Sequence, residues 1–290
     1  MHKIKILIPV YNDWDSLLIL LDKINSEISN LKQDISIIIV NDASNEDKPK
    51  MPDGYANIKS LKIINMKINK GHARCNASGL KYIFENEDFD YVIPMDGDGE
   101  DRPEEIKNFI NHINNNPDTV IVGERVKRSE GFFFKFCYAF HKIVTLIFTG
   151  KLIKFGNYTC LPKSIVQKMI KEKSTWSSFS GALTKLTKKR LSIPSIRGSR
   201  YHGPSKMNFK NLILHSLSII SVFKMNVLIR SILFLLVYIF LVYQNISIIV
   251  LIPVFLVFLL VVLAFLVSKR ESLDEINNSL SNISNIDQIK

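Results

Sequence analysis

The stretch YVIPMDGDGEDRPEEI, residues 91–106, joins a short apolar run to a dense group of acids. Residues 91–95 have the length and composition of a buried β-strand. Four acids follow it closely: Asp96, Asp98, Glu100 and Asp101. Because like charges repel and are costly to desolvate, the group is either a solvated turn or a site for a divalent cation. Residues 102–105, RPEE, are typical of a helix start and favour the turn.

Short apolar runs alternate with helical patterns on both sides of this stretch. Strands are expected at residues 4–10, 35–40, 58–64, 91–95 and 119–122, and helices at 14–28, 72–85 and 103–114. Short apolar strands between helices predict an α/β fold with a mostly parallel sheet covered on both faces. Ligands bind such sheets beyond the carboxyl ends of the strands, where the sequence places PVYND (9–13), VNDAS (40–44) and the acidic stretch.

The positive charge of the chain is concentrated in its second half. The net charge is +11, and no Asp or Glu occurs between Glu172 and Glu271. A basic stretch of this kind fits either nucleic acid or anionic lipid and phosphate. Because the same stretch contains a long apolar segment, we favour membrane lipids and phosphate as partners and expect no nucleic acid.

The apolar segment, residues 227–268, is too long for one membrane span and is interrupted by Gln244 and Asn245. It predicts a transmembrane hairpin with spans at about residues 227–243 and 246–267. Lys and Arg flank both ends, so the positive-inside rule places both termini in the cytosol and the interruption outside. A helical hairpin buried in a soluble core is the alternative, which the length of the apolar run disfavours.

The sequence also predicts the structure of three segments near the hairpin. Residues 207–226 predict an interfacial amphipathic helix, because their apolar residues recur at near-helical spacing. Residues 269–290 form a cytosolic tail, either a short amphipathic helix or disordered. Residues 131–150 are very apolar but contain lysine and histidine, so they predict either a core helix or a second helix in contact with the membrane.

Six motifs lie in order along the chain: PVYND (9–13), VNDAS (40–44), NKGHARCNASGL (69–80), MDGDGEDRPEEI (95–106), GERVKR (123–128) and RYHGPSK (200–206). Together with the hairpin, this order resembles the family-2 glycosyltransferases with the GT-A fold. The nearest resemblance is to the membrane-anchored polyprenyl-phosphate sugar transferases, the dolichol-phosphate-mannose-synthase-like group. It covers residues 3–206 and implies that residues 1–206 are a cytosolic catalytic domain.

The resemblance implies an inverting, metal-dependent glycosyltransferase at the cytoplasmic membrane. Such an enzyme moves a sugar from a nucleotide-diphosphate sugar to a polyprenyl phosphate of the undecaprenyl type. Two alternatives stay open: a hydroxyl acceptor on a saccharide or lipid, and an inactive glycosyltransferase-like assembly subunit. The sequence does not determine the sugar, the nucleotide (UDP or GDP), the prenol length or whether copies associate.

The resemblance also answers the question raised by the acidic stretch. Asp96 and Asp98 fill the family's DxD positions, and a Mg²⁺ or Mn²⁺ ion between donor phosphates takes oxygen ligands of this kind. Asp98 is expected to bind the metal directly and Asp96 to face the ribose or a metal-bound water. Glu100 is a third candidate ligand, with the solvated turn as its alternative.

The remaining site residues are assigned by the same resemblance. The donor nucleotide is expected at Pro9, Tyr11, Asp13, Asp42, Gly71, Arg74 and Asp96. The acceptor phosphate is expected at Arg128, Arg200, Ser205 and Lys206, and Arg125 and Arg200 join Asp96 and Asp98 as catalytic residues. The alternatives are a helix cap or turn for Asp13 and Asp42, and a patch that contacts only anionic lipid for the basic residues.

One position departs from the family pattern. Relatives often have GDFRL where this chain has GNYTCL, residues 156–161, so Asn157 stands in place of an acid. The change alters either the sugar preference or the activity. No histidine is assigned as a base, because an acceptor phosphate is largely dianionic at neutral pH and can attack without one.

Overall fold

The computed structural model describes residues 1–52, 54–127, 132–204 and 209–290. The strands are β1 (Lys3–Val10), β2 (Asp34–Asn41), β3 (Leu61–Met66), β4 (Tyr91–Pro94), β5 (Val120–Lys127), β6 (Phe155–Pro162), β7 (Arg190–Ile196) and β8 (Ile283–Gln288). The helices are α1 (Trp14–Glu27), α2 (His72–Asn86), α3 (Ile106–Ile113), α4 (Phe132–Thr149), α5 (Lys163–Met169), α6 (Phe179–Leu186), α7 (Phe209–Ser221), α8 (Lys224–Val242), α9 (Ile248–Ser268) and α10 (Leu273–Asn277). Short 3₁₀ turns are η1 (Pro103–Glu105), η2 (Lys173–Trp176) and η3 (Ser279–Asn282).

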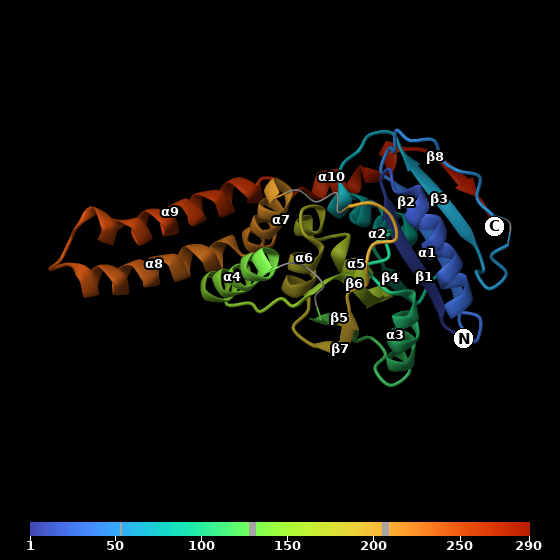
Figure 1. The fold of residues 1–290 in the computed structure, drawn as a ribbon, viewed down its shortest axis with the longest axis horizontal. Coiled ribbons are helices and arrows are strands. Elements are labelled where there is room, and N and C mark those ends of the chain that lie inside the picture. The colour runs from blue at the N-terminus through green and yellow to red at the C-terminus, as the bar shows by residue number, and fades with distance from the viewer. Residues whose placement is uncertain (53, 128–131, 205–208) are drawn as a thin grey trace.

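The described strands form one mixed sheet in the order β7-β5-β6-β4-β1-β2-β3-β8, with helices on both faces (Figure 1). β1 pairs in parallel with β2 and β4, and β2 pairs in parallel with β3. The carboxyl ends of these four strands therefore meet at one edge of the sheet. β6 runs antiparallel to β4, so its first residues reach the same edge. The predicted α/β class with a mostly parallel sheet is confirmed.

Each face of the sheet has its own apolar core. On one face, alternate residues of β1 such as Ile6 and Ile8 pack with α1 and α3. On the other face, Leu7 packs with α2, α5 and α6. Burial on both faces explains why the strands are apolar without interruption. Gly79 lets α2 approach β1 closely, because a Cβ at this position would lie 2.4 Å from Leu7 Cδ1.

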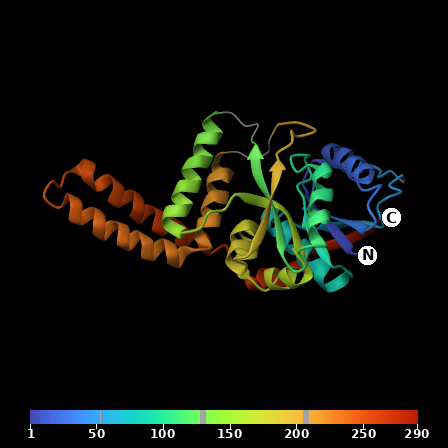
Figure 2. The same cartoon turned by 90° about the horizontal axis from the view of Figure 1, so that it is seen from below.

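The long hairpin of α8 and α9 projects from one end of the molecule, and both chain termini lie at the other end (Figure 2). Both helices are long and apolar enough to cross a membrane, and their most apolar stretches are only 11% buried within the protein. Lys224 Nζ donates to Ser268 Oγ at 3.0 Å, which links the first turn of α8 to the last turn of α9. The predicted pair of apolar helices is present.

Helix α4 packs against this hairpin. Arg230 of α8 donates to the backbone carbonyl of Ile147 at 3.1 Å, and Asn226 donates to that of Thr149 at 3.2 Å. Both bonds satisfy carbonyls that the end of a helix leaves without a partner. Phe140 and Ile143 on α4 remain 61% and 56% exposed. Of the two alternatives for residues 131–150, the described part of the segment fits the helix beside the membrane segment better than the core helix.

The segment after the hairpin differs from the sequence expectation of a short helix or disorder. It forms α10, η3 and β8, and β8 pairs antiparallel with β3 as an edge strand of the sheet. Ile276 of α10 is fully buried against Ala77 and Trp176. Residues 269–290 are therefore structurally part of the sheet domain. The many asparagines and serines in this segment give no strand signal in the sequence, and the strand forms by pairing with β3 alone.

Candidate active site

The acidic stretch and the basic segment that begins at Arg200 meet at the carboxyl edge of the sheet. The Arg200 guanidinium donates to Asp98 Oδ2 at 2.5 Å and to Asp13 Oδ2 at 2.6 Å. All three side chains are largely buried. Charge-assisted bonds with two carboxylates fix the position of a guanidinium, because its donors are held in a rigid plane. One arginine thus joins the loop after β1, the loop after β4 and the segment after β7.

Backbone contacts hold the two segments against each other. The Gly198 N–H donates to the Glu100 carbonyl at 2.9 Å, and the Tyr201 N–H donates to the Asp98 carbonyl at 3.0 Å. The Glu100 carboxylate forms an ion pair with Arg197. Gly99 has a φ of +90°, and a Cβ there would lie 2.5 Å from the Tyr201 ring. Only glycine fits this position, so the acidic stretch is shaped to receive the later segment.

Asp96 is the centre of a second cluster. Its Oδ1 lies 3.3 Å from His72 Nε2 and accepts a long hydrogen bond of 3.4 Å from Asn157 Nδ2. The His72 ring nitrogen is itself 2.5 Å from Asn157 Nδ2. The Asp96 backbone N–H donates to Asp101 Oδ2 at 3.0 Å, and Arg125 lies 3.6 Å from Asp101 Oδ1. Asn157 therefore touches both the Asp96 carboxylate and a histidine.

The three aspartates differ in their affinity for a proton. Burial and, secondly, the neighbouring Asp96 raise the pKa of Asp98 to about 6 and the pKa of Asp101 to about 8. Burial also opposes the ionisation of Asp96, but His72 and Arg125 outweigh it and lower the Asp96 pKa. Of these carboxyls, Asp101 therefore holds its proton to the highest pH, and Asp96 ionises most readily.

The predicted donor residues lie on neighbouring loops. Tyr11 is 43% exposed at the end of β1, whereas Pro9 is buried inside the strand. Asp42 is 4% exposed, and its two carboxylate oxygens accept the backbone N–H groups of Lys70 and Gly71 at 2.9 and 2.7 Å. In this arrangement, Asp42 holds the loop that starts α2.

Gly71 and Arg74 extend this part of the site. Gly71 has a φ of +92° at the residue before α2, a conformation that favours glycine. Arg74 donates to the Lys70 carbonyl at 3.0 Å, and its guanidinium lies over the Trp176 ring. Both residues are thus tied to the same loop as Asp42.

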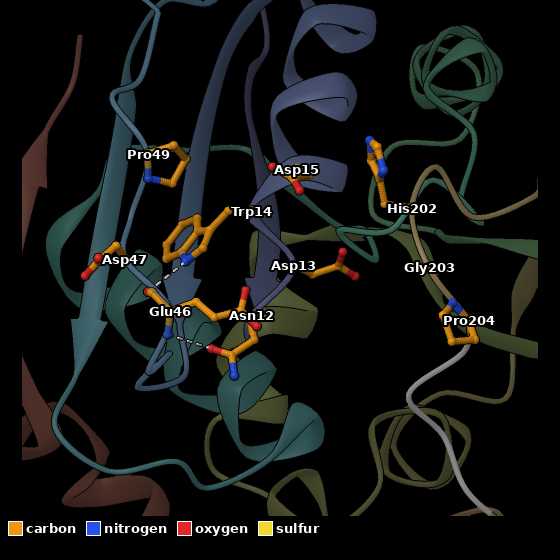
Figure 3. Close-up of a pocket in the computed structure, with 10 residues that line it drawn as sticks. All are labelled: Asn12, Asp13, Trp14, Asp15, Glu46, Asp47, Pro49, His202, Gly203 and Pro204. Atoms are coloured by element: carbon orange, nitrogen blue, oxygen red, sulfur yellow. Dashed lines mark hydrogen bonds between the residues drawn. The ribbon is translucent and has the colours of Figure 1, made fainter.

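A hollow of about 480 Å³ lies beside Asp13, between the loops after β1 and β2 and the segment after Arg200 (Figure 3). Trp14 and Asn12 line one side of it, and His202 and Pro204 line the other. Four carboxylates also line it: Asp13, Asp15, Glu46 and Asp47. These charges repel phosphate, so the hollow by itself is unsuited to the diphosphate of a donor.

The structure brings together most of the residues that the sequence predicts. Asp13, Asp98 and Arg200 are in contact, and Arg125 of β5 lies beside Asp101, in the loop that also carries Asp96. Arg128, Ser205 and Lys206 lie outside the described residues. Within the described part of the chain, no three His, Cys, Asp or Glu side chains form a ligand set for a metal ion.

Three residues near the site were not predicted from the sequence: His72, Arg197 and Asp101. His72 begins α2 directly after Gly71, which is a position where a helix start faces a ligand. Asp101 adjoins the predicted metal residues, and Arg197 precedes the RYHGPSK motif by three residues. Closeness in sequence to predicted residues is the signal that could have found them.

Comparison with known proteins places this geometry in a family. The model of glycosyl transferase family 2 matches residues 5–175. Undecaprenyl-phosphate 4-deoxy-4-formamido-L-arabinose transferase from Proteus mirabilis (strain HI4320) is 27% identical over 218 residues, which are 73% of this chain and 65% of that protein. The protein of the same name from Yersinia pestis (strain Pestoides F) is 28% identical over 196 residues, 64% of this chain and 58% of that protein. The match spans less than two thirds of the length of these curated relatives.

Two solved structures share the fold at low sequence identity. TarS of S. aureus, residues 1–349 in complex with UDP-GlcNAc, has a TM-score of 0.52 and 14% identity over 79% of this chain and 69% of that chain. Glucosyl-3-phosphoglycerate synthase from Mycobacterium tuberculosis, with Mn²⁺, UDP-glucose and phosphoglyceric acid, has a TM-score of 0.54 and 11% identity over 78% of this chain and 80% of that chain. The predicted GT-A-type sheet is confirmed, and the chain belongs to glycosyl transferase family 2.

Proposed function

We propose that this chain is an inverting glycosyltransferase that moves a sugar from a nucleotide-diphosphate sugar to a polyprenyl phosphate of the undecaprenyl type. The observation that carries the proposal is the contact of Arg200 with Asp98 and Asp13. In this contact, a residue of the expected acceptor segment touches two residues of the expected donor and metal site, which supports a reaction between the two substrates there. The names of the relatives, which are undecaprenyl-phosphate sugar transferases, support the same acceptor.

The acidic stretch fits a divalent cation, Mg²⁺ or Mn²⁺. Asp96, Asp98 and Asp101 crowd into one loop, where burial and mutual repulsion raise the pKa values of Asp98 and Asp101 even with Arg200 and Arg125 nearby, so a divalent cation would be favourable there. Asp98 and Asp96 are the residues that would hold the ion, which when bound neutralises charge on the leaving diphosphate. Glu100 pairs with Arg197 as Asp98 pairs with Arg200, so an ion bound by either carboxylate would take the place of an arginine.

The chain's own residues position the two substrates. Tyr11 and the loops held by Asp42 would bind the nucleotide, and Arg200, with Arg128, Ser205 and Lys206, would bind the acceptor phosphate. An oxygen of that phosphate attacks the anomeric carbon as the bond to the diphosphate breaks, and the nucleoside diphosphate leaves. Because the nucleophile is already an anion, the chain supplies orientation and charge neutralisation and needs no strong base.

The membrane location follows from the hairpin. α8 and α9 expose their apolar side chains, and a bilayer would cover them. α7 and the exposed face of α4 would lie at the bilayer surface, which brings the site to the depth of a lipid phosphate. The basic flanks of the hairpin favour a catalytic domain on the cytosolic side.

Nucleotide release from the purified protein tests the proposal. The protein in nanodiscs is incubated with a panel of UDP- and GDP-sugars and Mn²⁺ or Mg²⁺, with and without undecaprenyl phosphate. We expect release of nucleoside diphosphate that requires both the metal and the lipid phosphate and that prefers one donor. Release that proceeds equally well without the lipid phosphate would contradict the proposed acceptor.

A hydroxyl acceptor is the second candidate, and one contact favours it. A hydroxyl nucleophile requires a base, and the His72 ring lies beside Asp96 at the site. In that case a saccharide or lipid without phosphate would support release, and His72→Ala would abolish it. Nucleotide binding without transfer to either acceptor class would instead support an inactive subunit and implicate Asn157.

A further inference from the structure

A row of hydrogen bonds runs across the sheet from β8 to the loop after β1. Asn65 Nδ2 donates to Asp287 Oδ2 at 2.9 Å, and Asn41 Nδ2 donates to Asn65 Oδ1 at 2.9 Å. The Ser44 backbone N–H donates to Asn41 Oδ1 at 3.0 Å. The Asn12 backbone N–H donates to Ser44 Oγ at 2.9 Å. We call Asp287, Asn65, Asn41 and Ser44 the amide row.

The two ends of the amide row fix its direction. An ionised carboxylate can only accept, and a backbone N–H can only donate. Lys48 and Asn65, through hydrogen bonds to the carboxylate, lower the pKa of Asp287, so it is ionised at neutral pH. With Ser44 donating at one end and Asp287 accepting at the other, Asn41 and Asn65 each have one orientation that satisfies both neighbours. Asp287 and the Ser44 N–H therefore together set the orientation of amides that lie on β2 and β3.

The sheet register explains why these residues meet. Asn41 and Asn65 are register partners on β2 and β3, and Asn65 lies opposite Asn285 on β8. Asp287 is two residues beyond Asn285 and so points to the same face. Asn41 is only 9% exposed, and a buried amide without partners would cost about 1–3 kcal/mol. The edge strand thus accepts a hydrogen bond from Asn65, whose own oxygen accepts one from the buried Asn41.

The far end of the row reaches loops with unusual backbone conformations. Asn12 has a φ of +49° and Ala43 a φ of +56°, which are uncommon for residues other than glycine. The Asn12 side-chain oxygen also accepts the backbone N–H groups of Asn45 and Glu46 at 3.0 and 3.3 Å. These two loops carry Tyr11, Asp13 and Asp42. Their strained conformations persist because hydrogen bonds such as those of the amide row hold them.

We infer that Asp287, on the strand that follows the membrane hairpin, is a positioning residue of the donor nucleotide site. It acts through Asn65 and Asn41 on the loops after β1 and β2 and does not itself touch the nucleotide. The inference rests on the proposed function. It also gives the returning segment of the chain a role, because the strand that anchors the end of the hairpin to the sheet also orders the donor loops.

Calorimetric binding of UDP and GDP, with Mn²⁺ and the full chain in detergent, tests this role. We expect Asp287→Ala to raise the nucleotide Kd about fivefold to tenfold, the effect of losing one hydrogen bond. Asn65→Ala should have a similar effect. Asp287→Asn keeps an oxygen for Asn65 to donate to, so it should restore most of the affinity. In transfer assays the loss should appear in the donor KM and leave kcat nearly unchanged.

Ile289→Ala is the matched control. Ile289 lies on the same face of the last segment and packs against the core without joining the amide row. We expect this variant to lower Tm and leave the nucleotide Kd unchanged. An Asp287→Ala protein with lowered Tm and unaltered Kd overturns the inference, and so does an equal loss of affinity in Ile289→Ala. If the wild-type chain binds neither nucleotide, the proposed function fails and the inference fails with it.

Discussion

Arg200 shows how a single residue links the two halves of the proposed reaction. Its guanidinium contacts Asp13 and Asp98, which come from loops 85 residues apart in the chain. An acceptor phosphate would compete with these carboxylates for the same planar donors. Arg200 is therefore expected to bind the acceptor phosphate and, through Asp98, to hold the acidic loop in place.

Asp98→Ala is expected to abolish sugar transfer and leave folding intact. Burial raises the Asp98 pKa to about 6, which means that the ionised carboxylate is unfavourable in the folded state. Its removal should therefore lower Tm little. Nucleotide release and Tm are measured together, with Asp22→Ala, an exposed acid on α1, as the control. Full metal-dependent activity in Asp98→Ala would contradict the metal assignment.

Arg200→Ala is expected to raise the KM for the lipid phosphate more than the KM for the nucleotide sugar. Arg200→Lys should recover little, since an ammonium cannot reproduce two directed bonds from one plane. Steady-state kinetics with each substrate varied in turn should show a loss in kcat/KM for the acceptor of about tenfold to a hundredfold. Lys107→Ala on α3 is the control, and equal losses for both substrates would assign Arg200 to the donor diphosphate.

At the scale of elements, Glu87 links two strands at the end of α2. Its carboxylate accepts from Lys5 of β1 at 2.8 Å and from Lys62 of β3 at 2.6 Å, and its side chain is 7% exposed. Burial raises the Glu87 pKa, but the hydrogen bonds from the two lysines outweigh it, and the pKa is lowered overall. The ion triad thus helps to set α2, and with it His72 and Arg74, against the sheet.

Glu87→Gln is expected to destabilise the protein by about 3 kcal/mol at neutral pH, because it leaves two lysines without their partner charge. For a domain of this size, that loss lowers Tm by roughly 5–10 °C. Since the folded pKa is depressed, the stabilisation is present above the unfolded value of about 4.3 and is lost as the pH falls through the folded value. Thermal unfolding of both proteins at pH 7 and pH 4 should show a smaller Tm difference at pH 4, and an unchanged difference would contradict the role of charge.

At the scale of the whole molecule, both ends of the hairpin attach to one sheet domain. α7 precedes α8 after the segment that follows β7, and the chain returns from α9 to β8 at the opposite edge of the sheet. Figure 1 shows the hairpin extending from the domain at one end. Attachment at two places restricts rotation of the domain about the hairpin. The site is thus expected to keep a fixed orientation toward the bilayer.

This arrangement predicts the outcome of cysteine labelling in intact cells. Asn245→Cys, at the hairpin tip, should react with a membrane-impermeant maleimide from outside, whereas Ser284→Cys on exposed β8 should react only after lysis. Both cysteines are introduced into a Cys137→Ser protein, in which the remaining native cysteines, Cys75 and Cys160, are buried and should not react. Labelling of both positions from the same side before lysis would contradict a membrane-spanning hairpin.

The fold class, the position of the apolar hairpin and the order of the motifs could all be predicted from the amino-acid sequence. These features depend on local patterns: apolar runs of strand length, helical spacing and short polar motifs after strands. Neighbouring strands at 4–10, 35–40 and 91–95 were predicted within about two residues because both of their faces are buried, which leaves a continuous apolar signal.

The sequence did not predict that β8 joins the sheet, that Arg200 pairs with Asp98 and Asp13, or that His72 and Asn157 meet at Asp96. Most of these contacts join residues far apart in the chain, 61 residues for the bond from Asn157 to Asp96 and 222 residues for the bond from Asn65 to Asp287. No local pattern encodes such pairs. They form because the parallel sheet brings the ends of distant strands to one edge, where side chains of opposite charge and complementary hydrogen bonding then select their partners.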